Sequence, residues 1–137
     1  MIVGCDTGFF LNLLQGEERP GEYWSRIVSG EFQAIVSIIT FFELSFLVKR
    51  GRIEGQAFDV IMPAIQALCK IISLSEASHF SHIAACVSEK GCSLNQAVIA
   101  STFLDEKVTC VLTNDTAMAD FFAENVDVIV LNNKEQQ

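Results

Sequence analysis

Residues 1–7 read MIVGCDT, a short apolar run that ends at a carboxylate. A run of this kind, closed by a polar residue, is typical of a strand that is buried on both faces of a sheet. Similar runs recur at residues 32–38, 70–74, 109–112 and 126–131, with helical patterns between them. Strands that alternate with helices form βαβ units, so the pattern predicts a parallel sheet with helices on both faces.

The segments between these runs carry helical patterns. Helices are expected at residues 9–14, 22–29, 40–50, 53–68, 76–90, 93–106 and 115–122. Pro63 should kink or divide the helix that contains it. We therefore predict a three-layer α/β/α fold with a central, mostly parallel sheet of about five strands. The absence of linkers and repeats predicts that residues 1–137 form one domain.

The charge of the chain excludes nucleic-acid binding by bulk attraction. It has 9 Lys and Arg residues against 17 Asp and Glu residues, a formal net charge of −8. Binding to phosphates ordinarily depends on clustered Lys and Arg side chains. Chemistry on a nucleic acid would therefore need metal ions, or a partner, to offset the repulsion.

The chain is also unusually apolar. Hydrophobic residues make up 50% of it and its mean hydropathy is +0.37. This favours a second buried surface, such as a dimer or partner interface, with a tightly packed monomer as the alternative. No apolar run reaches the roughly 18 residues of a membrane span, so no membrane partner is expected. The 5 cysteines form no C-x-x-C and no signal peptide is evident, which predicts reduced thiols in a cytoplasmic protein.

Acidic residues follow several of the predicted strands. Asp6 comes directly after the first strand, Glu43 about one helical turn after the second, and Asp115 shortly after the fourth. Asp120 lies about one turn beyond Asp115. The carboxyl ends of parallel strands share one edge, so these side chains should meet there. Like charges about 4 Å apart cost a few kcal/mol each, and a bound cation would relieve that cost. Ligands that are all oxygen select Mg²⁺ or Mn²⁺.

Each acidic residue also has a purely structural interpretation. Thr40 and Glu43 match the capping box S/T-x-x-E, in which the Glu reaches back to the start of its helix. Asp6 and Asp115 are both suitable N-caps, and Asp120 fits a solvated helical position. Their combination and order favour the metal pocket over these separate explanations.

Four motifs together resemble the PIN-domain family of ribonucleases, which includes the toxins of VapBC-type toxin–antitoxin pairs. They are IVGCDT (residues 2–7), VSIITFFEL (36–44), LNQAVIA (94–100), and LTND (112–115) followed by Asp120-Phe121. The resemblance covers nearly the whole chain and implies a PIN-like fold. It implies a ribonuclease that hydrolyses RNA phosphodiester bonds with Mg²⁺ or Mn²⁺, with two ions about 3.5–4 Å apart.

One residue departs from the family pattern. Gln96 stands where the family usually places its third carboxylate. Its carbonyl oxygen suits a hard cation, but it supplies neither charge nor a base; the alternative is a helical residue facing solvent or a neighbour. Asn95 is a weaker substitute ligand, because it points about 100° away on a helix, and a polar residue of the first turn explains it equally.

The resemblance implies a role for each candidate residue. Asp6, Glu43 and Asp115 would be catalytic. The metal ligands would be Asp6, Glu43, Gln96, Asp115 and Asp120. The supporting residues would be Thr7, Thr40, Asn95 and Thr113. A small antitoxin protein and a second copy of the chain, forming a homodimer, are the partners implied beside the RNA substrate.

The compact basic cluster is Lys49, Arg50 and Arg52. These residues are candidates for contacting RNA phosphates, and a solvated helix end that complements the macrodipole is the alternative. A second reading of the whole chain also stays open: a catalytically weakened PIN-like module that acts by binding RNA or protein. No phosphate-binding glycine loop of the P-loop or dinucleotide type is present.

Overall fold

The core of the molecule is a five-stranded sheet in which every pairing is parallel. The computed structural model describes residues 1–73 and 77–131, so the expected strand end at residue 74 and helix start at residue 76 lie outside the described residues. The strands are β1 (Ile2–Cys5), β2 (Gln33–Ser37), β3 (Cys69–Ile72), β4 (Cys110–Thr113) and β5 (Asp127–Val130). Their order across the sheet is β3-β2-β1-β4-β5. The predicted α/β fold with a parallel sheet is confirmed.

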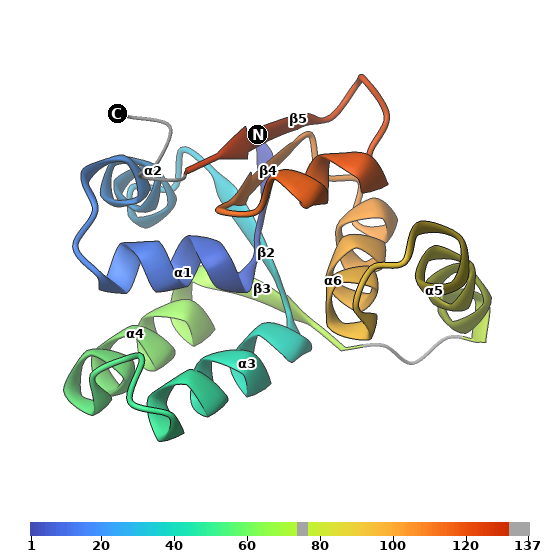
Figure 1. The fold of residues 1–137 in the computed structure, drawn as a ribbon. Coiled ribbons are helices and arrows are strands. Elements are labelled where there is room, and N and C mark those ends of the chain that lie inside the picture. The colour runs from blue at the N-terminus through green and yellow to red at the C-terminus, as the bar shows by residue number, and fades with distance from the viewer. Residues whose placement is uncertain (74–76, 132–137) are drawn as a thin grey trace.

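Helices cover both faces of this sheet (Figure 1). The helices are α1 (Thr7–Leu14), α2 (Glu18–Val28), α3 (Ile38–Lys49), α4 (Gly55–Leu68), α5 (Ala77–Lys90), α6 (Leu94–Asp105) and the 3₁₀ helix η1 (Thr116–Phe121). Figure 1 shows α1 to α4 on one side of the sheet and α5, α6 and η1 on the other.

Alternation along the strands explains the two faces. Ala34 and Val36 of β2 belong to the core cluster that includes residues of α1, α3 and α4, whereas Ile35 packs with α6. Successive strand side chains point to opposite faces, so a strand covered on both sides must be apolar throughout. This is why the strands read as continuous apolar runs.

The register brings two strand ends to the same level. Cys5 of β1 pairs with Leu112 of β4, and the backbone N–H of Asp6 donates to the carbonyl of Leu112 at 3.3 Å. Asp6 is therefore held beside the end of β4, where Thr113 and Asp115 follow. Sites in open α/β sheets form at the carboxyl ends of the strands, and the ends of β1 and β4 are therefore the expected place of the site in this protein.

Two expected helix starts were wrong, and at Pro63 the division, one of two expected outcomes, does not occur. Helix α2 begins at Glu18 rather than residue 22, because Pro20 falls in the first turn, where its missing N–H costs nothing. Helix α3 begins at Ile38, two residues before the expected Thr40, because the Ser37 hydroxyl accepts from the N–H of Ile39 and serves as N-cap. Helix α4 also runs through Pro63 as one undivided helix.

The five cysteines are all free thiols. Within the described residues, no helix is both long enough and apolar enough to cross a membrane.

Candidate active site

Asp6 joins strand β1 to helix α1 and is buried, with 4% of its surface exposed. One carboxylate oxygen accepts the N–H of Phe9 at 2.9 Å and thereby caps α1. The other oxygen accepts the hydroxyl of Thr113, which in turn accepts the N–H of Asp115 at 3.0 Å. The capping interpretation and the pocket interpretation of Asp6 are thus compatible, because each oxygen has a different partner.

Glu43 enters the site from the first turns of α3. The hydroxyl of Thr7 donates to its Oε1 at 2.7 Å and lies 3.2 Å from the buried hydroxyl of Thr40. Thr40 therefore does not cap a helix, and the capping-box explanation of Glu43 is wrong, since Ser37 takes the N-cap position. The Glu43 carboxylate is instead directed across to the start of α1.

Gln96 connects helix α6 to Asp115. Its Oε1 accepts the N–H of Ser93 at 3.3 Å, and its own N–H donates to the Ser93 hydroxyl, which completes a capping box. Its Nε2 donates to Oδ2 of Asp115 at 2.5 Å. The other oxygen of Asp115 accepts the N–H of Ala117 at 2.9 Å and caps η1. Gln96 thus contributes a hydrogen-bond donor to the site, not a charge.

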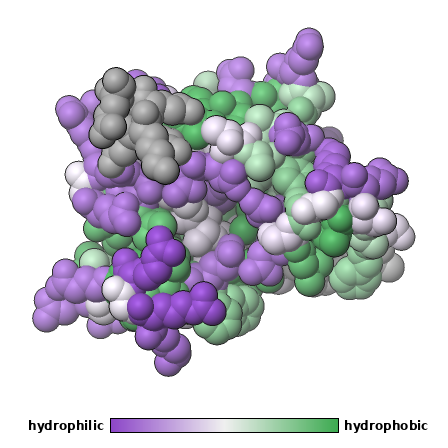
Figure 2. Space-filling model, viewed as in Figure 1, coloured by the Kyte–Doolittle hydropathy of each residue, from purple (hydrophilic) through white to green (hydrophobic). Residues whose placement is uncertain are grey.

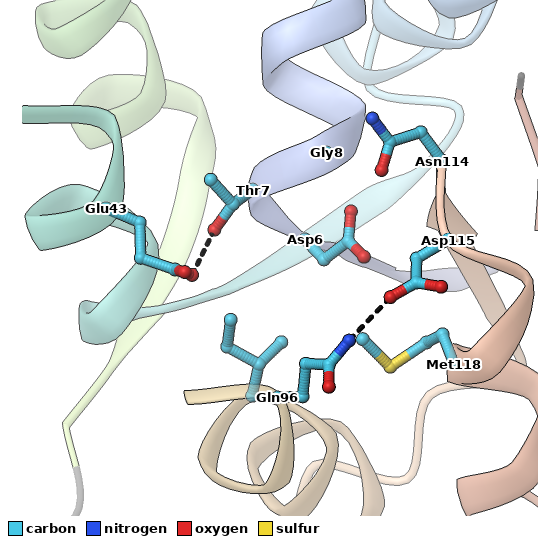
Figure 3. Close-up of a pocket in the computed structure, with 9 residues that line it drawn as sticks. Asp6, Thr7, Gly8, Glu43, Gln96, Asn114, Asp115 and Met118 are labelled. Carbon is cyan, nitrogen blue, oxygen red and sulfur yellow. Dashed lines mark hydrogen bonds between the residues drawn. The ribbon is translucent and has the colours of Figure 1, made fainter. Parts of the chain in front are cut away.

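These groups surround one hollow of about 140 Å³ at the carboxyl edge of the sheet. Its polar lining residues are Asp6, Thr7, Glu43, Gln96, Asn114 and Asp115. Figure 3 shows the carboxylate of Asp6 between those of Glu43 and Asp115, each carried by a different segment of the chain. Residues more than 100 positions apart in sequence therefore share one acidic pocket.

The electrostatics of the pocket act most strongly on Asp6. The pKa of its carboxyl is raised from the ordinary 3.8 to about 6, chiefly by burial and in smaller part by the nearby charges of Asp115 and Glu43. The hydrogen bonds from Thr113 and from the N–H of Phe9 lower the pKa and offset part of this rise. The pocket thus destabilises its own negative charge, which is the condition that a bound cation relieves.

The donor set fits a hard divalent cation in its chemistry. Asp6, Glu43 and Asp115, which line the hollow, offer carboxylate oxygens, whereas the carbonyl oxygen of Gln96 accepts the N–H of Ser93. Even so, among the side chains that the structure describes, no three from Asp, Glu, His or Cys are already arranged around one ion position. Figure 3 shows that two of the three carboxylates are engaged with neighbours, Glu43 with Thr7 and Asp115 with Gln96.

Several candidates lie outside this hollow. Asp120 is exposed on η1 and does not line it, so its role as a ligand stays a prediction. Asn95 and Arg50 line a neighbouring hollow, which shares Thr7 and Glu43 with the acidic one. Lys49 and Arg52 are exposed and line neither of these two hollows.

Four residues of the pocket wall were not among the predicted site residues: Gly8, Ile99, Asn114 and Met118. Asn114 lines the hollow, and its Nδ2 donates to Oδ1 of the buried Asn12 at 3.3 Å. Asn12 in turn donates to the carbonyl of Leu131. The polar side chain of Asn12 within the apolar run FFLNLL was the only sign in the sequence of this buried hydrogen bond. Gly8 lies so close to Asn114 that a Cβ there would be 1.9 Å from its Oδ1, which no sequence pattern indicates.

The family model for the PIN domain matches residues 3–122. The chain belongs to the PIN-domain family. The resemblance of the four motifs is thereby confirmed. PIN domains are typically nucleases, and the family generally uses divalent metal ions. No curated protein sequence matches this chain significantly.

Solved structures agree with the family assignment at the level of the fold. VapBC2 from Rickettsia felis, bound to a DNA fragment from its promoter, aligns with a TM-score of 0.72 at 16% identity, covering 96% of this chain and 100% of that chain. The sarcin-ricin loop cleaving toxin VapC20 from Mycobacterium tuberculosis aligns with a TM-score of 0.70 at 14% identity, covering 91% and 98%. FitAcB from Neisseria gonorrhoeae aligns with a TM-score of 0.65 at 23% identity, covering 94% and 96%. This PIN domain is thus similar to toxin ribonucleases at low sequence identity.

Proposed function

We propose that this protein is a Mg²⁺- or Mn²⁺-dependent ribonuclease that hydrolyses phosphodiester bonds of RNA. The observation that carries the proposal is the convergence of Asp6, Glu43 and Asp115 on one hollow at the carboxyl edge of a PIN-domain sheet. Neither Ser-His chemistry nor a nucleotide-binding loop competes for this hollow, whose lining is acidic and amide in character.

Asp6, Glu43 and Asp115 would hold the metal, and the carbonyl oxygen of Gln96 would join them only on leaving its hydrogen bond with the N–H of Ser93. The ion would lower the pKa of a water molecule and neutralise charge on the phosphate. Thr113 orients Asp6 by donating to it, and Thr7 orients Glu43 in the same way. The hydrogen bond from Gln96 holds the Asp115 carboxylate toward α6. Asp120, exposed one turn away, would contribute through water.

A role as the toxin of a toxin–antitoxin pair is the biological form of this proposal. Its support is the similarity to VapBC2 and FitAcB, at the level of the fold. A small antitoxin and a homodimeric assembly are proposed with it. Exposed large apolar side chains support an interface with a partner. Figure 2 shows such hydrophobic surface among hydrophilic side chains on the face that carries α3, α5 and α6. Light scattering gives the mass of the purified chain alone, which tests the homodimer, and its mass with the product of the adjacent gene, which tests antitoxin binding.

One observation favours a second function, that of a PIN-domain module that binds RNA or protein without cutting. The Gln96 amide occupies an oxygen of Asp115 with a neutral donor, so the pocket has one carboxylate fewer than its relatives are expected to have. A metal would then bind more weakly, since each lost charge removes a favourable interaction with the ion.

Cleavage of RNA decides between these functions. Purified protein is incubated with single-stranded and structured RNA in Mg²⁺, Mn²⁺ or EDTA, beside the Asp6→Asn variant. Asn keeps an oxygen for the N–H of Phe9, so the variant should fold while losing the ligand charge. Metal-dependent cleavage by the wild type alone supports the ribonuclease. Cleavage by both proteins would indicate a contaminating nuclease, and binding without cleavage would favour the second function.

A further inference from the structure

A second hollow of about 340 Å³ adjoins the acidic pocket. Its lining residues are Thr7, Glu43, Phe46, Leu47, Arg50 and Asn95. Thr7 and Glu43 line both hollows, and Figure 3 shows the hydrogen bond that joins these two residues in the shared wall. The two hollows therefore lie side by side along Thr7 and Glu43, within reach of one polymer.

The second hollow combines an aromatic face with a positive charge. Phe46 and Arg50 lie three and seven residues after Glu43, which places all three on one side of α3. Phe46 is 56% exposed, so its aromatic side chain is accessible to a ligand. Among the described residues, no carboxylate lies within ion-pair distance of Arg50. An exposed ring and an unpaired guanidinium thus stand one helical turn apart.

The other walls give the hollow a floor and a polar edge. Leu47 is partly buried against the main core and forms an apolar floor. Asn95, exposed in the first turn of α6, adds an amide with both donors and an acceptor on the opposite side. The volume falls within the range of about 300–1,000 Å³ that small ligands occupy in proteins.

We propose that this hollow is a subsite for one unpaired nucleotide of RNA, next to the phosphate held at the acidic pocket. The inference rests on the proposed ribonuclease function and specifies its substrate as single-stranded RNA or a loop. The base would stack on Phe46, because every base offers a π-face to an aromatic ring. Its phosphate would contact Arg50, and Asn95 would face the edge of the base. A base in this position is unavailable for pairing, so a duplex is excluded from the subsite.

The charge of Arg50 favours a nucleotide over a peptide as the occupant. A peptide drawn to the acidic pocket would carry cations, and the guanidinium of Arg50 would repel them. A nucleotide gains from the same cation through its phosphate and from Phe46 through its base. The aromatic ring and the cation thus suit the two halves of one ligand.

The chain offers a matched control for the aromatic residue. Phe42 lies one turn before Phe46 on α3 and is also 56% exposed, but it does not line this hollow. Binding of a fluorescein-labelled RNA pentanucleotide is measured by anisotropy in Ca²⁺, with the RNA checked on a gel to remain intact. Phe46→Ala should weaken binding about fivefold or more, the effect of one lost stacking contact, and Phe42→Ala less than twofold. Equal effects of the two substitutions would overturn the subsite.

A second comparison tests the cation. Arg50→Ala should weaken binding and reduce the salt dependence of log K by about one phosphate contact. Arg52→Ala removes the same charge from an exposed position outside the hollow and should have the smaller effect. An equal loss in both variants would mean general steering by the basic cluster, and would contradict a defined phosphate contact at Arg50.

Two further arms separate the alternatives. RNA duplex of the same length should bind equally well to wild type and Phe46→Ala. Loss of binding to an arginine-rich peptide in Phe46→Ala, with RNA binding unchanged, would assign the hollow to a peptide and refute the nucleotide. Because binding is measured without cleavage, a protein that binds RNA through Phe46 but never cuts it would sink only the ribonuclease proposal. Cleavage that is unaffected by Phe46→Ala, with unaffected binding, would sink only the subsite.

Discussion

Replacing Asp6 by Asn should stabilise the metal-free protein near neutral pH while weakening its metal binding. Asp6 is buried, and its pKa is raised from 3.8 to about 6, so the folded protein holds this proton more tightly than the unfolded chain does. Between these two values the folded state binds more protons, and stability must therefore fall as the pH rises through them. Asn has no proton to lose in this range.

The magnitude follows from the two pKa values. At about 1.4 kcal/mol per pKa unit, the step from 3.8 to about 6 corresponds to about 3 kcal/mol once Asp6 is fully ionised. With the same values, the cost is about 1.5 kcal/mol at pH 5 and about 3 kcal/mol at pH 8. The stability of Asp6→Asn minus that of the wild type should therefore increase by about 1.5 kcal/mol across this interval.

Urea unfolding in EDTA, followed by the fluorescence of Trp24, measures this difference between pH 5 and pH 8. Trp24 packs against Phe10 in the main core, so its emission reports global unfolding. The lower limit stays above the pI of about 4.6, where the protein is least soluble. Asp59→Asn, which removes a charge from an exposed position of α4, is the matched control and should show a nearly constant difference.

A difference between Asp6→Asn and wild type that stays flat from pH 5 to pH 8 would refute the claim that the pocket destabilises an ionised Asp6. Metal supplies the complementary test at pH 7.5. A cation at about 100 times its Kd adds about 2.7 kcal/mol to the stability of a protein that binds it only when folded. The wild type should gain this stabilisation in Mn²⁺, and Asp6→Asn should gain much less.

Three other changes have defined outcomes. Gln96→Asp should tighten Mn²⁺ binding in calorimetry about tenfold or more, because it restores a charge beside Asp115; unchanged affinity would place Gln96 outside the ligand set. Gly4→Ala should lower the free energy of unfolding by about 1–3 kcal/mol, since its Cβ would lie 2.7 Å from the buried ring of Phe103, and a neutral effect in urea would contradict that tight packing. Thr113→Val should cost about 1–3 kcal/mol and weaken Mn²⁺ binding, because Asp6 loses a buried donor; full retention of both would show that Thr113 positions nothing.

The strands and the main candidates could be predicted from local sequence. A strand buried on both faces must be apolar throughout, so its position is written directly in the residue pattern. Asp6 and Asp115 follow such runs, and parallel topology sends both to the same edge of the sheet. The strand positions and the shared edge of Asp6 and Asp115 are therefore predictable without knowledge of side-chain packing. Helix starts were less accessible, because Ser37 and Thr40 are both capping residues and only their surroundings decide between them.

The packing of Thr40 shows what decided that choice. Its hydroxyl is fully buried and lies 3.2 Å from that of Thr7, a contact between residues 33 positions apart. The same contact frees Glu43 from capping and directs it into the pocket. The hydrogen bond between Asn12 and Asn114 and the close approach of Gly8 to Asn114 likewise join segments about 100 residues apart. No local pattern encodes such distances.

Residue type and order were enough to predict a parallel sheet with carboxylates at one edge, because an apolar run marks a buried strand and alternation with helices implies parallel strands. The hydrogen bonds of those carboxylates depend instead on contacts between distant segments. The tertiary structure paired Gln96 with Asp115, Thr7 with Glu43 and Thr113 with Asp6. It also set Phe46 and Arg50 into a hollow beside the pocket, because hydrogen bonds and cavities arise from side chains that packing alone brings together.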